Sequence, residues 1–216
     1  MKTPTLLTAF AAALALGGVA TLSAQNSPPQ VPGAMDASRV TAGTYAVDPA
    51  HTLVGWRANH FGFNDYLGLF GSAEGTLQLD PANVESAKVD ISVPVGMVTV
   101  ASDGLRDHLL RPGKDGAAPD FFGADPVPAR FVSTAVRRTG DTTAEITGDL
   151  TLNGVTRPVT IDAEFSGAGV NPMNKKETLG FEGSATIKRS EFGVAYGIPL
   201  VSDEVELDIS AAFEKQ

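Results

Sequence analysis

The stretch "LTLNGVTRPVTIDAEF", residues 150–165, alternates apolar and polar side chains on both sides of an Asn-Gly pair. Asn-Gly tolerates the positive φ angles of a two-residue hairpin turn, so the stretch predicts two antiparallel strands joined by that turn. The register then sets Leu152 opposite Val155 and Ile146 opposite Ile161. One face of the hairpin is apolar and the other is rich in threonine and acidic residues, which is typical of a sheet with one buried side.

The same period of two recurs along the chain, and turn-forming residues separate most of the alternating stretches. Eight antiparallel strands at this spacing predict an all-β barrel or sandwich, and closure into a barrel would leave no exposed edge strand. The expected strands are residues 53–60, 69–79, 87–93, 131–136, 144–152, 155–165, 179–188 and 205–213.

One short helix is expected at residues 102–110, where Leu105 and Leu109 share a face. The polar residues of the same segment, among them Arg106 and His108, are expected to face solvent. The helix should end at the Pro-Gly break that follows it.

A long loop without regular pattern follows the helix and carries Phe121 and Phe122. Loops of this length usually form a lid, a rim or a binding element. We expect this loop to lie at the mouth of the barrel.

The N-terminal residues are typical of an exported protein. Residues 1–24 combine one lysine with an acid-free run rich in alanine and leucine, which predicts a secretory signal peptide. Residues 25–43 are rich in proline, serine and glycine and predict a flexible linker. The remaining residues, 44–216, have a length suited to one domain.

Composition argues against several classes of function. The chain has no cysteine, which excludes disulfides, thiolate metal sites and a cysteine nucleophile. A net charge of −9 without a basic patch argues against a nucleic-acid partner. The histidines His51, His60 and His108 lack metal-binding spacing, and no hydrolase or phosphate-loop motif is present. We therefore expect no metal and no catalytic cofactor.

Seven motifs spread over nearly all of the predicted domain resemble, in this order, the YceI family. The resemblance implies an exported, periplasmic protein with a lipocalin-like, eight-stranded barrel and an apolar tunnel that holds a polyisoprenoid or a related lipid. The same resemblance makes a homodimer a candidate assembly. Gly123 stands where the family usually has Asp, and "RPGKDGAAPD" lengthens the loop before it. The motifs are "YAVDPAHTLVGW", "NHFGF", "GLFGSAEG", "LRDHLL", "FFGADPVPARF", "GDLTLNGVTRPVTI" and "IKRSEFGV".

The apolar inner face of such a barrel can be filled by its own side chains or left open for a ligand, and eight strands leave an interior just wide enough for either. Small inward residues such as Gly183 and Ala185, together with an aromatic content of only 7%, favour an open interior. An open interior would suit a long hydrocarbon, because each buried CH₂ contributes about 0.8 kcal/mol. A polar head contact contributes only about 1–3 kcal/mol.

The candidate ligand-binding residues form three groups: a donor for the head group, side chains that cover the mouth, and side chains that line the space for the tail. His60 ends its strand and could donate a hydrogen bond to a lipid head group, although a structural histidine fits equally well. Arg157 shares the apolar face close to a turn, where it could reach a phosphate or extend to water, and the second interpretation is favoured. Leu105, Leu109, Phe121 and Phe122 would cover the mouth. The tail would be lined by Val54, Trp56, Phe131, Ile146, Leu150, Leu152, Ile161, Phe165 and Ile187.

The sequence leaves three functions open. The first is a carrier or sequestering protein for a polyisoprenoid, an isoprenoid quinone or a similar lipid, with no enzymatic activity. The second is an enzyme acting on a lipid or quinone, with His60 or His108 as general base. The third is an interaction module of the envelope that docks a partner through Phe121 and Phe122.

Overall fold

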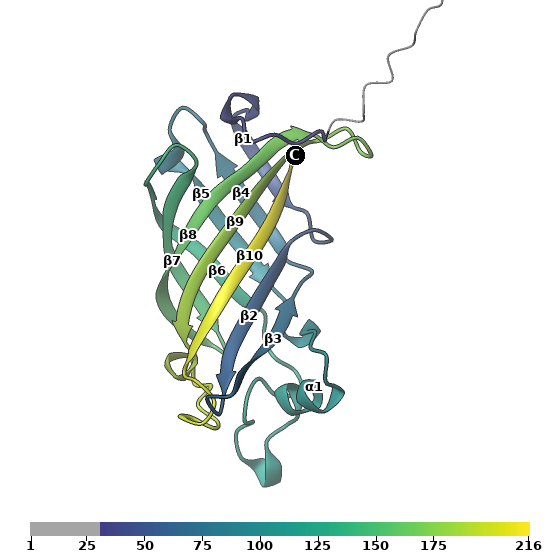
Figure 1. Cartoon of the computed structure of the whole chain (residues 1–216), viewed down its shortest axis with the longest axis vertical. Coiled ribbons are helices and arrows are strands. Elements are labelled where there is room, and N and C mark those ends of the chain that lie inside the picture. Colours follow the sequence, from purple (N-terminus) through teal and green to yellow (C-terminus); the bar gives the residue numbers. More distant parts are fainter. Residues whose placement is uncertain (1–30) are drawn as a thin grey trace, which may run out of the picture. The chain divides into compact units, whose positions relative to one another are not determined.

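The computed structural model describes residues 31–216. The predicted signal peptide and residues 25–30 of the predicted linker lie outside the described residues. Within residues 31–216 the dominant structure is one antiparallel sheet of ten strand segments that closes on itself (Figure 1). The strands are β1 Gly43–Val47, β2 Leu53–His60, β3 Asn64–Phe70, β4 Glu74–Leu79, β5 Lys88–Val93, β6 Ala129–Arg138, β7 Thr143–Leu152, β8 Val155–Val170, β9 Glu177–Lys188 and β10 Glu204–Lys215.

The ten segments occupy eight positions around the barrel, because two of its strands are interrupted. β1 and β2 both pair with β10, the first through Val47 and Phe213 and the second through Val54 and Ile209. β3 pairs with β2, while β4 pairs with β1 and β5. The predicted eight-stranded antiparallel barrel is therefore confirmed.

The β7–β8 hairpin has the register that its sequence predicts. Leu152 pairs with Val155 and Ile146 pairs with Ile161. Asn153 and Gly154 form the turn with φ angles of 52° and 77°, the left-handed conformation that Asn-Gly accommodates. Local turn chemistry thus fixes which side chains of β7 and β8 face the interior.

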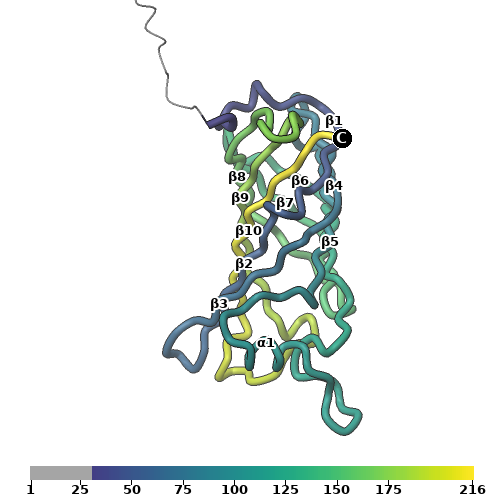
Figure 2. Tube along the Cα trace, turned by 90° about the vertical axis from the view of Figure 1, so that its right-hand side faces the viewer, coloured from purple at the N-terminus to yellow at the C-terminus, as the bar shows by residue number. Residues whose placement is uncertain are grey.

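One end of the barrel carries the connections that matter for the site. Helix α1, Asp103–Leu110, lies there with the β2–β3 turn and the β9–β10 connection, whereas β1 and the C-terminus lie at the opposite end (Figures 1 and 2). The helix begins where the Ser102 hydroxyl accepts a hydrogen bond from the Leu105 N–H at 3.2 Å. Ahead of the helix, Thr99 forms a β-bridge with Leu69 of β3. Short 3₁₀ turns lie at Ala37–Arg39, Val84–Ser86, Val95–Met97, Lys114–Gly116 and Arg189–Phe192.

The end near β1 and the C-terminus has a packed core, which we call the closed end. Tyr45 and Leu179 are fully buried there, and Val136 and Phe213 are nearly so. These side chains come from β1, β9, β6 and β10, so they link strands from all around the barrel. The closed end therefore supplies the close packing that the fold requires.

Residues 31–42 differ from the prediction of a flexible linker, because they lie against the closed end. Ala34 and Ala168 exchange backbone hydrogen bonds of 3.1 and 2.8 Å. The Thr41 N–H donates to the Glu177 carboxylate at 2.8 Å. Backbone pairing with β8 and a side-chain acceptor on β9 explain why a segment without periodicity is ordered.

Glu177 is the centre of the polar contacts at this end. The buried Tyr45 hydroxyl donates to Glu177 Oε1 at 2.6 Å, and Lys215 Nζ lies 3.6 Å from Oε2. Burial raises the pKa of Glu177, but the hydrogen bonds from Thr41 and Tyr45 outweigh burial and hold its pKa below the usual 4.5. The carboxylate form is thus favoured by the fold.

We predict that Glu177→Gln lowers the free energy of unfolding at pH 7 by about 1–2 kcal/mol, because charge-assisted hydrogen bonds become neutral ones. A lowered folded-state pKa contributes stability that is present above pH 4.5 and is lost as the pH falls through the folded-state value. Denaturant unfolding at several pH values should show the gap between wild type and variant closing in acid. The exposed Glu164→Gln is the control, and a gap that persists unchanged in acid would contradict the assignment.

Candidate functional site

The rest of the barrel interior is hollow and holds a cavity of about 920 Å³. Ligand pockets in proteins typically measure about 300–1,000 Å³, so this cavity lies at the large end of that range. Inward side chains such as Ile161, Leu207 and Ile209 are only half-buried although they point to the inside of the barrel. They face open space, so the interior is not filled by its own side chains.

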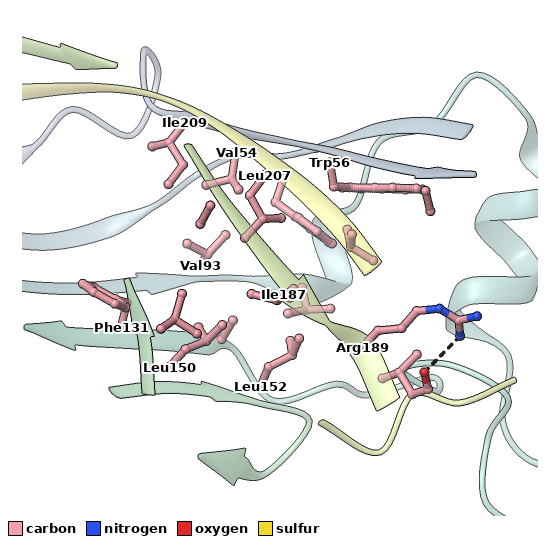
Figure 3. A pocket seen from close by; sticks show the side chains of 18 of the residues that line it. Val54, Trp56, Val93, Phe131, Leu150, Leu152, Ile187, Arg189, Leu207 and Ile209 are labelled. Atoms are coloured by element: carbon pink, nitrogen blue, oxygen red, sulfur yellow. Dashed lines mark hydrogen bonds between the residues drawn. The ribbon is translucent and has the colours of Figure 1, made fainter. Parts of the chain in front are cut away.

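The cavity runs from the closed end to the mouth near α1. Val47, Leu77 and Phe213 line it at the closed end, and Phe61 and Leu200 line it at the mouth. Figure 3 shows Val54, Leu207 and Ile187 around the space, with Phe131 toward one end and Arg189 at the other. The cavity is therefore a channel with an apolar wall.

The cavity exists because several residues on the inner face of the barrel are small. Ala163 of β8 and Ala185 of β9 line the cavity at positions where larger side chains would project into it. Gly183 of β9 makes room for its neighbours, because a Cβ atom there would lie 3.2 Å from Ile161 and 3.5 Å from Ile209. Ala185 pairs with Leu207 and Gly183 pairs with Ile209, so each small residue lies beside a large one on β10. The alternation of sizes keeps the wall continuous and the middle open.

Thirteen of the fourteen side chains predicted to contact a ligand line this cavity. The structure brings together strand residues and residues from the helix and the long loop, which lie far apart in the sequence. Whether they contact a lipid stays a prediction. The thirteen are Val54, Trp56, His60, Leu105, Leu109, Phe121, Phe122, Phe131, Ile146, Leu150, Leu152, Ile161 and Ile187.

Phe165 is the exception, because it does not line the cavity. It packs against the closed-end core, and its ring lies 5.7 Å from that of Phe181. The β8–β9 register shifts just after Phe165. The alternation along the strand correctly predicts that Phe165 points inward. Whether an inward side chain joins the core or lines the channel depends on its position along the barrel axis.

Two other predictions concern polar residues. Arg157 is exposed and does not line the cavity. Its position agrees with the interpretation that its side chain extends to water. His108 was expected to face solvent with Arg106, but it is half-buried and lines the cavity. Its Nε2 lies 2.8 Å from Asp120 Oδ2, a partner on the long loop.

The sequence reasoning did not select several residues that line the channel. Val205, Leu207 and Ile209 of β10 follow a clear alternation, so their pattern could have identified them. Tyr196 and Leu200 lie in the β9–β10 connection, where no period indicates a direction.

Aromatic and basic groups gather at the mouth. The His108 ring lies 5.1 Å from the rings of both Phe121 and Tyr196, measured between centroids. Asp120 also accepts a hydrogen bond from Arg111 at 2.5 Å, and these two partners hold the pKa of Asp120 below its usual range. His60 packs edge-on against Phe61 at 4.3 Å. The mouth thus combines apolar rings with hydrogen-bonding groups.

Arg189 follows the last residue of β9 and is only 6% exposed. Its guanidinium donates to the carbonyl oxygens of Ser202, Val194, Tyr196 and Val201 at 2.8–3.0 Å. These bonds tie the β9–β10 connection to the end of β9. The guanidinium carbon also lies 6.0 Å from the centroid of the Phe121 ring, so Arg189 joins this connection to the long loop.

Trp56 lies flat against Gly68 of the neighbouring strand. A Cβ atom at Gly68 would lie 2.3 Å from the indole, which is closer than atoms can approach. The indole N–H is buried and has no hydrogen-bond partner among residues 31–216. Gly68 is therefore needed for the indole to lie along the channel wall.

A model of the YceI-like domain matches residues 45–213, which is most of the chain. The chain belongs to the YceI family. A UPF0312 protein of Pseudomonas putida strain F1 is 35% identical over 185 residues, covering 84% of this chain and 92% of that protein. A UPF0312 protein of Pseudomonas fluorescens strain SBW25 is 36% identical over the same length and the same shares of both chains.

Solved structures show the same barrel as this YceI-family chain. Burkholderia cenocepacia BcnA is 25% identical and covers 77% of this chain and 98% of its own, with a TM-score of 0.62. A polyisoprenoid-binding domain from Saccharophagus degradans is 12% identical and covers 80% of this chain and 98% of its own, with a TM-score of 0.56. At that low identity the second comparison concerns the fold alone.

Residues 31–216 contain neither a candidate metal site nor a helix able to span a membrane. No group of three or more His, Asp or Glu side chains is placed to hold a metal ion. No helix in this part of the chain has the length and hydropathy to cross a membrane.

We predict that Gly68→Ala pushes the Trp56 indole into the channel and lowers the free energy of unfolding by about 1–3 kcal/mol through overpacking. Trp56 is the single tryptophan of the chain, so its fluorescence and near-UV circular dichroism report the displacement directly. Gly33→Ala is the control, because nothing lies within 4 Å of a Cβ atom at that position. Unchanged spectra for Gly68→Ala would mean that the indole lies elsewhere.

Proposed function

We propose that this YceI-family protein is an exported, periplasmic lipid-binding protein. It holds a polyisoprenoid, an isoprenoid quinone or a similar long-chain lipid for sequestration or transport. The observation that carries the proposal is the cavity of about 920 Å³, whose wall is almost entirely apolar along the barrel. The polyisoprenoid-binding domain from S. degradans has the same barrel, so the fold is compatible with this class of ligand.

A long hydrocarbon suits this channel better than a compact polar molecule. Each buried CH₂ contributes about 0.8 kcal/mol, so a chain of about twenty carbons gains roughly 16 kcal/mol before the costs of association and ordering. A single polar contact adds about 1–3 kcal/mol. Affinity should therefore come from the tail, and the direction of the ligand from its head.

A binding role without covalent chemistry fits the histidines at the mouth. His108 has a carboxylate partner, but Asp120 also pairs with Arg111, which stabilises the carboxylate and weakens it as a proton acceptor. His60 packs against Phe61 and Tyr66. Phe121 and Phe122 line the channel, so their side chains serve the cavity better than an outside partner.

Export is proposed from the leader-like residues 1–24, which combine a single lysine with an apolar run and small residues. Edman sequencing of protein recovered from the periplasm should give a new N-terminus near Ala24. Retention in the cytoplasm with Met1 intact would contradict this part of the proposal.

We predict that the purified mature protein carries or takes up a long-chain lipid. Organic extraction followed by mass spectrometry identifies the lipid, and native mass spectrometry gives its mass together with the number of subunits. A ligand present at about 100 times its Kd should stabilise the fold by about 2.7 kcal/mol and raise Tm by roughly 5–10 °C. A barrel that neither carries nor takes up any such lipid would refute the proposed function.

A matched pair of variants on β9 tests whether the channel is the binding site. Ala185→Phe places a ring inside the channel and should weaken uptake of a prenyl lipid at least about tenfold, which corresponds to about 1.4 kcal/mol. Thr186→Phe places the same ring on the exposed outer face one residue later and should leave uptake unchanged. Lipid titrations followed by Trp56 fluorescence measure both. Equal affinities for the two variants would place the lipid outside the barrel.

A further inference from the structure

The channel has one buried charge on its wall, and it lies at the mouth. Among the described residues that line the cavity, Arg189 and Glu182 alone belong to the Lys, Arg, Asp and Glu types. Glu182 is exposed and accepts a hydrogen bond from Ser210. Arg189 is therefore the ionic group that a ligand inside the channel would meet.

The hydrogen bonds of Arg189 do not neutralise its charge. A guanidinium has five N–H donors, and four of them are taken by backbone carbonyl oxygens. The fifth, on Nη2, has no acceptor among residues 31–216. No carboxylate in this part of the chain forms an ion pair with Arg189, and burial lowers the pKa of its guanidinium although Asp203 acts in the opposite direction.

Two carboxylates near the mouth, Asp120 and Asp203, are engaged with other groups. Asp120 pairs with His108 and Arg111. Asp203 accepts hydrogen bonds from the Ser190 N–H at 2.9 Å and from the Ser190 hydroxyl at 2.7 Å. A buried charge that is solvated only by carbonyl dipoles is costly, and a counter-ion from outside the chain would relieve the cost.

We propose that Arg189 receives an oxyanionic head group, a carboxylate or a phosphate, on the lipid that the channel binds. This inference rests on the proposed function and narrows its ligand class to acidic lipids. The head group lies at the mouth beside Nη2 of Arg189, with the rings of Phe121 and Tyr196 around it. The tail extends toward Phe131 and the closed end.

Three probes that share one hydrocarbon chain test the head group. A prenyl carboxylic acid should bind at least about tenfold more tightly than its methyl ester, and a prenyl phosphate should share this advantage. Trp56 fluorescence titrations measure all three. If the acid and the ester bind equally well, the head-group site is refuted while the lipid-binding function stands. If none of the probes binds, the proposed function itself fails.

Arg189→Gln removes the charge but keeps an amide that can donate to the backbone carbonyls. It should reduce the ratio of the affinities for acid and ester to about one. A residue that only ties the β9–β10 connection would lower both affinities together and leave their ratio unchanged. The matched control is Arg157→Gln, an exposed arginine outside the cavity, which should keep the wild-type preference.

Photolabelling of the wild-type protein tests the same proposal even if Arg189→Gln does not fold. A prenyl acid with a photoreactive group next to its carboxylate should label the mouth peptides around residues 119–124 and 189–203. The same group at the far end of the chain should label the walls around Phe131 and Ile146. Labelling of the closed end by the head-group probe would overturn the proposal.

Discussion

The structure depends on how large and small side chains are divided over the inner face of the barrel. At the closed end Tyr45, Leu179 and Phe213 fill the interior, whereas Ala163 of β8 and Ala185 of β9 leave it open farther along the barrel. Protein interiors normally pack as densely as organic crystals, so an open apolar channel forgoes contacts that the closed end and the hydrogen-bonded wall must offset. A hydrocarbon chain in the channel restores such contacts, and ligand binding and stability are linked for this reason.

The mouth is built on a different principle from the wall. Its segments lack the period of a strand, and they are held by polar contacts: the four bonds of Arg189, the pairing of Ser190 with Asp203, and a hydrogen bond from Asn153 to the Phe192 carbonyl at 3.2 Å. Because hydrogen bonds between buried polar groups are directional, they position these loops more specifically than apolar packing could. Under the proposed function, the wall would therefore provide affinity and the mouth would provide selection.

The sequence predicts the elements whose signals are local. The Asn-Gly turn and alternation fix the β7–β8 register, and Ser102 fixes the start of α1. β1 and most of β3 were not predicted, because β1 is short and β3 exposes Leu67 and Leu69 on its outer face, which hides the period of two. The same limit explains Phe165: parity gives the direction of a side chain, but only closure of the whole barrel determines what that side chain meets.

The polar residues of the site depend on contacts that no local pattern contains. Asp120 lies on the long loop, twelve residues after His108, and the carbonyls that bind Arg189 belong to a connection without period. Many different sequences can form strands with alternating apolar residues. The S. degradans domain, which has the same barrel at 12% identity, illustrates this freedom. The arrangement around Arg189 requires specific donors and acceptors at fixed positions, so differences among related barrels in the lipid they select should arise at the mouth rather than along the wall.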